Sequence, residues 1–387
     1  MTNKILTSFL IFIFFFAFNL YAKESFIPDP PSLNSLNYIL IDAQTNRVLA
    51  QKNSSDRIEP ASITKIMTGY VVSDQIKQGY IKLDDEVLIS ENCWRKGGSR
   101  MFIEEGSKVL LLDLIKGMVI QSGNDASCAI AEHVAGSEDN FVQLMMKYVR
   151  EMELANSNFK NHTGWPDEGH YSSAEDIAKF SALLIKNFPD HYSLYKEKWF
   201  TYNNIKQKNR NALLWQDNSI DGLKTGHTET AGYCLVSSGV RDETRLIAVT
   251  LKSSSEKTRL TDNRKLLDYG FRYFKTQKLV SKGQNIKQEQ VWGGVVDKVS
   301  LTPIKDFYLT LSSRDFKKIK PTITLNDYLQ APLEKNQIVG KMSFKLEGKE
   351  VGSVDLMTLD KVKSKGIFGK AWSNIKLLVY RFLMKED

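Results

Sequence analysis

Predicted strands at both ends of a long helical region constrain the fold of this chain most strongly. Residues 38–42 and 47–50 are extended around a turn at 44–46, and the next clear strands, 232–240 and 246–251, come much later. Between and after them, apolar residues recur at intervals of three and four. This spacing predicts helices over 62–79, 110–120, 126–135, 139–152, 173–186 and 257–274. Such an order predicts one sheet that is assembled from distant segments and covered by helices.

After Thr276 the pattern changes to short β-rich runs separated by turn residues, at 299–302, 307–311, 323–325 and 342–346. A chain of 387 residues is also too long for one compact core. We therefore predict a first domain over 23–276 and a small all-β domain over 277–360.

The N-terminus has the features of an export signal over residues 1–22. Lys4 precedes an apolar run from Ile5 to Phe18, and Ala22 offers a small residue for cleavage. The alternative is an uncleaved membrane helix, but the run is shorter than the roughly 20 residues that span a bilayer. The expected location is the periplasmic face of a bacterial inner membrane.

The C-terminus, residues 365–387, is predicted to form an amphipathic helix. Its apolar residues Phe368, Trp372, Ile375, Val379 and Phe382 fall on one arc at about 100° per residue, with lysines and arginines elsewhere. Leu377 and Met384 depart from this pattern. The helix packs either on its own domain or in a lipid interface, and the aromatic and cationic residues favour the interface.

Charge and cysteine content exclude little. The net charge of +8 is spread among 45 acidic residues without a basic tract, so an anionic membrane or wall polymer is favoured over nucleic acid. Cys93, Cys128 and Cys234 lack metal-ligand spacing, and we expect neither a metal nor a cofactor. One oxidised pair is possible in an exported protein, but buried, separate thiols are the favoured interpretation.

Three short motifs occur in order: Ser62-Ile-Thr-Lys65, Ser122-Gly-Asn124 and Lys224-Thr-Gly226. Each is weak alone, since Ser-x-x-Lys occurs five times and His162-Thr-Gly164 is a variant of the third. Their order, their spacing and the position of Ser62 at a helix start indicate acyl-transfer chemistry.

The motifs supply the parts of an activated serine. Three residues along a helix place Lys65 on the face of Ser62, where a neutral amine can remove the hydroxyl proton. Burial and a second cation, for which Lys224 is the candidate, would lower the pKa of Lys65. Gly226 would let a substrate backbone approach the strand, and the N–H of His227 could join that of Ser62 in an oxyanion hole.

The wider sequence resembles the D-alanyl-D-alanine carboxypeptidases of the penicillin-binding protein 5 and 6 type. The resemblance rests on Glu59–Thr68, Gln121–Ala126, Tyr171–Ser173, Asn209–Trp215 and Asp221–Thr228, and it runs from Asn37 to the C-terminal helix. It implies an α/β (α+β) β-lactamase/transpeptidase-like domain with an antiparallel sheet and a helical cluster, followed by the all-β domain. It also implies removal of the terminal D-alanine from peptidoglycan pentapeptides, and acylation by β-lactam antibiotics.

The resemblance carries the following roles to this chain: Ser62 as nucleophile, Lys65 as base, Ser122 and Lys224 as proton relay, Asn124 as ligand of the substrate amide, Thr225, Gly226 and His227 as the docking strand, and Arg210 or Arg259 beside the substrate carboxylate. Two alternatives remain: a serine β-lactamase, and a non-catalytic penicillin-binding wall protein. The first lacks a convincing deacylating Glu between Asn124 and Lys224, and the second predicts degraded motifs.

Overall fold

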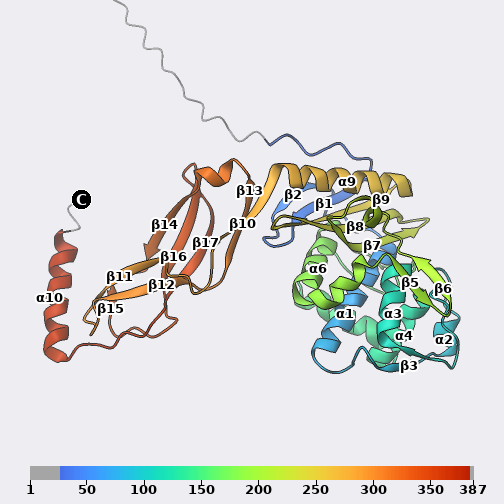
Figure 1. The fold of residues 1–387 in the computed structure, drawn as a ribbon, viewed down its shortest axis with the longest axis horizontal. Helices are drawn as coiled ribbons and strands as arrows, with labels where there is room; N and C mark the ends of the chain where they lie inside the picture. The colour runs from blue at the N-terminus through green and yellow to red at the C-terminus, as the bar shows by residue number, and fades with distance from the viewer. Residues whose placement is uncertain (1–26, 384–387) are drawn as a thin grey trace, which may run out of the picture.

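The computed structural model describes residues 27–383, so the predicted export signal lies outside the described residues. The chain forms a mixed α/β part, followed by a β-rich part that ends in one helix (Figure 1). This agrees with the predicted α/β fold class.

A five-stranded antiparallel sheet forms the centre of the first part, in the order β2-β1-β9-β8-β7. Its strands are β1 (Asn37–Asp42), β2 (Val48–Lys52), β7 (Ile220–Thr228), β8 (Gly232–Arg241) and β9 (Thr244–Ser253). The sheet therefore joins segments from both ends of the helical region, as predicted. Strand β7 is at its edge.

Strand alternation divides the core between the two faces of this sheet. Ile39 and Ile41 pack into the helical cluster, whereas Leu40 between them packs with Leu266 and Leu267 of the helix on the opposite face. That helix, α9 (Glu256–Tyr273), lies along the sheet in Figure 1.

The other helices of the first part are α1 (Thr64–Lys77), α2 (Glu91–Trp94), α3 (Leu111–Lys116), α4 (Asn124–Ala135), α5 (Glu138–Glu151), α6 (Ala174–Asn187), α7 (Pro189–Tyr192) and α8 (Leu213–Gln216). Short 3-10 turns are η1 (Ala61–Ile63) and η3 (Ser193–Lys196), and two hairpins pair β3 (Glu86–Leu88) with β4 (Lys108–Leu110) and β5 (Trp199–Tyr202) with β6 (Ile205–Lys208). Ser137, Ser173 and Ser255 accept backbone N–H bonds at the starts of α5, α6 and α9, which explains where these helices begin.

One predicted helix differs in form. The segment expected as a helix over 110–120 is α3 followed by the π-helical turn η2 (Gly117–Gln121). Gly117 lies against the side chain of Met101, and a Cβ at this position would collide with it. The π turn ends at Ser122, which has φ 66°.

The β-rich part has its own core, which includes Val299, Leu301, Phe344 and Leu356. Its strands are β10 (Phe274–Val280), β11 (Lys287–Trp292), β12 (Lys298–Pro303), β13 (Phe307–Ser312), β14 (Lys320–Leu325), β15 (Leu329–Gln330), β16 (Ile338–Leu346) and β17 (Lys349–Thr358), with a 3-10 turn η4 (Asp315–Lys318). Six of them form the sheet β14-β16-β17-β12-β11-β15, and β10 pairs with β13.

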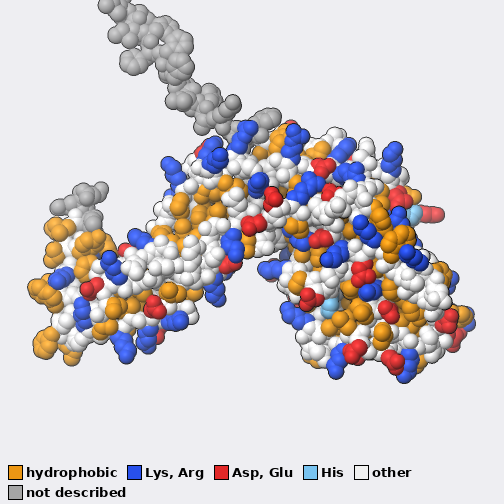
Figure 2. Space-filling view, in the orientation of Figure 1, with side chains coloured by type: hydrophobic (Ala, Val, Ile, Leu, Met, Phe, Trp, Pro, Cys, Tyr) orange, Lys and Arg blue, Asp and Glu red, His pale blue; other side chains and the backbone are white. Residues whose placement is uncertain are grey.

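The last helix, α10 (Ile367–Leu383), forms over the predicted apolar arc. Its buried residue is Leu377, and the Ser373 hydroxyl on the same face accepts a hydrogen bond of 2.6 Å from the Gly293 N–H. Leu377 therefore departs from the arc because it packs on the β-rich part. The arc itself points outward, where hydrophobic side chains gather at the end of the molecule (Figure 2); Phe368 is 92% and Phe382 69% exposed. Within residues 27–383, no helix is long and apolar enough to cross a membrane.

The expectation of three separate thiols is wrong for two cysteines. Cys93 of α2 and Cys128 of α4 form a disulfide, which leaves Cys234 as a buried free thiol. The sequence pattern missed this pair because α2 is a single short turn, and only tertiary packing brings it against α4.

Candidate active site

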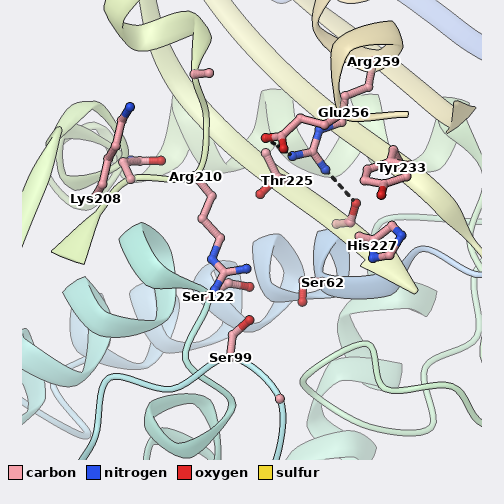
Figure 3. Close-up of a pocket in the computed structure, with 14 residues that line it drawn as sticks. Ser62, Ser99, Ser122, Lys208, Arg210, Thr225, His227, Tyr233, Glu256 and Arg259 are labelled. Carbon is pink, nitrogen blue, oxygen red and sulfur yellow. Dashed lines mark hydrogen bonds and ion pairs between the residues drawn. The ribbon is translucent and has the colours of Figure 1, made fainter. Parts of the chain in front are cut away.

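Ser62 lies in the 3-10 turn that leads into α1, at the floor of a cleft of about 710 Å³ (Figure 3). Ala61 before it has φ 47°, a conformation that non-glycine residues rarely adopt. Two glycines press on this turn: a Cβ at Gly226 would lie 3.0 Å from the Pro60 carbonyl oxygen, and one at Gly164 would collide with the Ala61 carbonyl. Gly226 thus lets β7 approach the nucleophile turn itself.

Lys65 is buried one turn further along. Its Nζ lies 3.1 Å from Ser62 Oγ, 2.7 Å from Asn124 Oδ1 and 2.8 Å from the Thr163 carbonyl oxygen. Burial, and then the positive charge of Arg210, lower the pKa of Lys65 to about 7. A large fraction of Lys65 is therefore neutral near neutral pH, and the amine is within hydrogen-bond distance of the hydroxyl that it would deprotonate.

Ser122, which lines the same cleft, and the buried Lys224 form a second pair. Lys224 Nζ donates to Ser122 Oγ at 2.9 Å and to the Thr225 carbonyl oxygen at 2.9 Å. Burial, and then the positive charge of Lys65, hold the pKa of Lys224 well below its usual range. Burial and Arg210 are the main causes of the low pKa of Lys65, and not Lys224, the cation that the sequence predicts for this role.

Asn124 joins the first helix to the loop over the cleft. Its Oδ1 accepts from Lys65, while its Nδ2 donates to the Gly97 carbonyl oxygen at 2.8 Å. The next residue, Asp125, was missed by sequence reasoning: its buried carboxylate accepts the N–H groups of Met101 and Phe102 at 3.0 and 2.9 Å. These bonds tie the loop to the start of α4.

The upper wall of the cleft is cationic. Arg259 is buried, donates to the Gly226 carbonyl oxygen at 3.2 Å and pairs with Glu256 at 3.1 Å. Arg210 extends toward Ser122 (Figure 3), and no ion pair to it forms among the described residues. His227 packs against Tyr233, with the ring centroids 4.1 Å apart and the rings tilted by 36°, beside the exposed end of β7. The positive charges of Arg259 and Arg210 would attract a carboxylate group of a substrate.

All ten predicted site residues belong to this one region. Seven of them line the cleft itself: Ser62, Ser122, Arg210, Thr225, Gly226, His227 and Arg259. Lys65, Asn124 and Lys224 lie just behind, bonded to Ser62, Lys65 and Ser122 respectively. The sequence does not predict that Thr163 binds Lys65, because Thr163 acts through its backbone carbonyl. The sequence feature that marks this segment is the His162-Thr-Gly164 variant of the third motif.

Metal-ligand geometry is poor in the described part of the chain. The one group of three candidate ligands is Cys93, Cys128 and Glu132, and both sulfur atoms are in the disulfide.

Two family models match the chain. Residues 24–255 match the model described as D-alanyl-D-alanine carboxypeptidase, and residues 274–364 match penicillin-binding protein 5, C-terminal domain. The D-alanyl-D-alanine carboxypeptidase DacA of Escherichia coli strain K12 is 42% identical over 93% of this chain and 91% of its own length. DacC of the same organism is 38% identical over 96% and 94%.

Solved structures agree with this match. Penicillin-binding protein 5 from Haemophilus influenzae superposes with a TM-score of 0.82 at 39% identity, over 87% of this chain and all of that one. Penicillin-binding protein 6B from Escherichia coli gives a TM-score of 0.74 at 35% identity, over 86% and 98%. These similarities do not favour a β-lactamase or a non-catalytic wall protein.

Proposed function

Because the chain belongs to the D-alanyl-D-alanine carboxypeptidase family of serine hydrolases, we propose that it removes the terminal D-alanine from peptidoglycan pentapeptides through an acyl-enzyme at Ser62. The observation that carries this proposal is the contact of 3.1 Å between Ser62 Oγ and the buried Lys65 amine. A serine hydroxyl is a weak nucleophile until a base accepts its proton, and Lys65 is that base.

In the first step the Ser62 oxygen attacks the carbonyl carbon of the peptide bond between the two D-alanines, while its proton passes to Lys65. The N–H groups of Ser62 and His227 stabilise the oxyanion. The C–N bond then breaks, and the leaving amine takes the proton that Lys65 received, relayed through Lys224 and Ser122, whose Nζ and Oγ are 2.9 Å apart, so that Lys65 is neutral again. Water hydrolyses the Ser62 ester, which releases the shortened peptide and restores the hydroxyl.

Substrate orientation follows from the charge of the cleft. The terminal carboxylate binds at the cationic wall, to Thr225 with Arg210 and Arg259, and Asn124 holds the amide that precedes the scissile bond. A β-lactam carries a carboxylate beside a strained amide, so it enters in the same orientation and acylates Ser62.

The cellular location is part of the same proposal. Residues 1–22 direct export and are removed, residues 23–276 form the catalytic domain, and 277–360 form the β domain. Residues 365–387 bind the periplasmic surface of the inner membrane through the exposed arc of α10. Support comes from the apolar side chains that α10 turns away from its own domain.

Intact-mass analysis after penicillin treatment tests the nucleophile. We expect one covalent adduct on the full chain, with peptide mapping to residue 62, and none on Ser62→Ala. The variant should also lose D-alanine release from a diacyl-D-Ala-D-Ala peptide. An adduct on folded Ser62→Ala, or full peptidase activity of this variant, would show that another residue is the nucleophile.

A further inference from the structure

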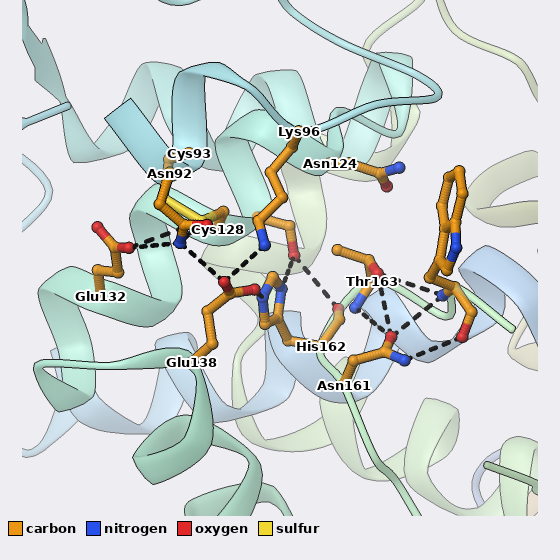
Figure 4. A network of polar contacts seen from close by, with 12 residues as sticks. Asn92, Cys93, Lys96, Asn124, Cys128, Glu132, Glu138, Asn161, His162 and Thr163 are labelled. Atoms are coloured by element: carbon orange, nitrogen blue, oxygen red, sulfur yellow. Dashed lines mark hydrogen bonds and ion pairs between the residues drawn. A yellow bond between two sulfur atoms is a disulfide. The ribbon is translucent and has the colours of Figure 1, made fainter. Parts of the chain in front are cut away.

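A buried histidine, His162, directly precedes Thr163, whose carbonyl oxygen contacts Lys65, and its ring lies beside Glu138 (Figure 4). His162 is 0% exposed, and both of its ring nitrogens have partners. Nδ1 lies 2.8 Å from Ser127 Oγ of α4, and Nε2 lies 2.6 Å from Glu138 Oε2 of α5. The imidazole therefore bridges two helices.

The partners define how this ring is bound. Despite partial burial, hydrogen bonds from His162, Asn92 and Lys96 hold the pKa of Glu138 well below its usual range, so Glu138 is a carboxylate. Burial lowers the pKa of His162, although Glu138 opposes this shift. The neutral ring donates from Nε2 to the Glu138 carboxylate, which leaves Nδ1 as an acceptor. The Ser127 hydroxyl lies 2.8 Å from Nδ1 and 3.2 Å from the His162 carbonyl oxygen, and it donates to Nδ1, the nearer of these two acceptors.

The backbone beside this ring reaches the catalytic amine. The carbonyl oxygen of His162 accepts from Thr68 Oγ1 of α1 at 2.7 Å, and the next carbonyl, that of Thr163, accepts from Lys65 Nζ at 2.8 Å. On the other side, Asn161 Oδ1 accepts the N–H groups of Thr163, Gly164 and Trp165 at 3.2, 2.8 and 3.1 Å. Residues 161–165 are thus held by their own turn and by three helices.

We propose that His162, anchored by Glu138 and Ser127, is a positioning residue that holds the Thr163 carbonyl against Lys65 and so directs the lone pair of the amine at Ser62. This inference rests on the proposed role of Lys65 as base. A neutral amine has two N–H groups: when these bind Asn124 Oδ1 and the Thr163 carbonyl, its lone pair faces Ser62 Oγ. If the Thr163 carbonyl moves, one N–H can turn toward Ser62, and the geometry for proton transfer is lost.

The test measures the second-order rate constant of acylation by a fluorescent penicillin, from pH 5 to 9, on the purified full chain. For His162→Leu we expect the rate constant to fall by about 10- to 100-fold, because a small misplacement of a catalytic group lowers the rate by a factor of this size. Because burial is the main cause of the low pKa of Lys65, a loosened segment that admits water should also shift the acid limb of the pH profile to higher pH. His162→Gln, which can still donate to Glu138, should recover most of the rate.

His170→Leu is the matched control. This histidine is also buried, at 3% exposed, and its ring contacts Thr64 Oγ1 at 2.9 Å, but it is not bonded to Ser127 or Glu138. Loss of either imidazole should lower the melting temperature, whereas only loss of His162 should shift the pH profile. Ser127→Ala, which removes one anchor with little change in volume, should lower the rate in the same direction if His162→Leu fails to fold.

The outcomes separate the two proposals. If the wild-type chain is not acylated at Ser62, the proposed function fails. If the wild type is acylated there, but folded His162→Leu keeps the wild-type rate constant and pH profile, only the positioning role is wrong. Unchanged kinetics of Ser127→Ala would contradict it in the same way.

Discussion

At the scale of single residues, the site is an arrangement of buried amines. Lys65 and Lys224 are both removed from water, and each lies within hydrogen-bond distance of a serine hydroxyl, that of Ser62 or of Ser122. Burial disfavours the charged form of an amine, so Lys65, the proposed base, needs no histidine–carboxylate pair to be partly neutral near pH 7. The cost of this burial is met by hydrogen bonds to Asn124 and to backbone carbonyls.

The acylation rate should depend on pH through Lys65. Its pKa is lowered to about 7, and only the neutral amine accepts the Ser62 proton, so the rate should fall about tenfold per pH unit below this value. Stopped-flow acylation by penicillin from pH 5 to 9 measures it. Lys65→Arg, whose side chain stays protonated, should lose acylation at every pH; a variant that regained activity at high pH would contradict the assignment.

Arg210 should bind the substrate carboxylate. Arg210→Ala removes a charge-assisted contact of about 1.5 to 3 kcal/mol, so kcat/KM for a D-Ala-D-Ala peptide should fall roughly 10- to 100-fold. Lys208→Ala is the control, because Lys208 lines the same cleft but places its ammonium over the Trp215 ring, 4.4 Å from the centroid. Arg210 is not the carboxylate ligand if both variants lose kcat/KM equally. The same follows if Arg210→Ala lowers kcat/KM as strongly for a peptide with an amidated C-terminus.

At the scale of elements, three segments meet at Ser62, the proposed nucleophile: the start of α1, the edge strand β7 and the start of α4. The disulfide between Cys93 and Cys128 ties α2 to α4, and Asn92 beside it donates to Glu132 and Glu138 at 2.9 and 2.8 Å (Figure 4). The loop that follows α2 carries Gly98 and Ser99 into the cleft. The disulfide therefore stabilises the loop that follows α2, in which the Gly97 carbonyl oxygen accepts a hydrogen bond from Asn124.

Loss of this disulfide should destabilise the catalytic domain. It closes a loop of 35 residues, for which chain entropy gives about 3 to 4 kcal/mol. The double variant Cys93→Ala/Cys128→Ala should lower the free energy of unfolding by this amount in urea titration. Cys234→Ala, at a buried free thiol, is the control; an equal loss in the control would show that the effect is one of packing alone.

At the scale of the whole molecule, the catalytic part and α10 lie at opposite ends, with the β-rich part between them (Figure 1). The link is partly polar: Thr276 and Thr45 both contact the Thr310 hydroxyl, at 2.9 and 2.6 Å. This arrangement places the proposed membrane-binding arc far from the cleft, so the two proposed activities would use separate surfaces.

Removal of residues 366–387 should release the protein from membranes without a change in peptidase activity. The lost arc includes Phe368, Trp372 and Phe382, all more than 60% exposed. Flotation with vesicles that contain anionic lipid measures the binding, and D-alanine release measures the activity. A truncated chain that still floats would place the membrane contact elsewhere; Leu377→Ala in the full chain, which leaves the arc intact, should keep binding.

Local sequence patterns predict most of the helices and strands. The order of the three short motifs along the chain predicts the candidate site. Periodicity placed α5, α6 and α9 within a few residues, because their serine caps and apolar faces are encoded locally. It also located α10 and its outward arc. It did not foresee the π turn before Ser122, which depends on the packing of Gly117 against Met101.

The sequence by itself determined which residue types are available for acyl transfer and which segments are helix or strand. Only the tertiary structure decided that the Thr163 carbonyl binds Lys65, that Arg210 is the cation acting on that lysine, and that Cys93 meets Cys128. The physical reason is range: helix and strand patterns reflect neighbours within a few residues. These interactions join residues 35 to 145 positions apart in the chain, and the one from Thr163 uses a backbone atom that every residue possesses.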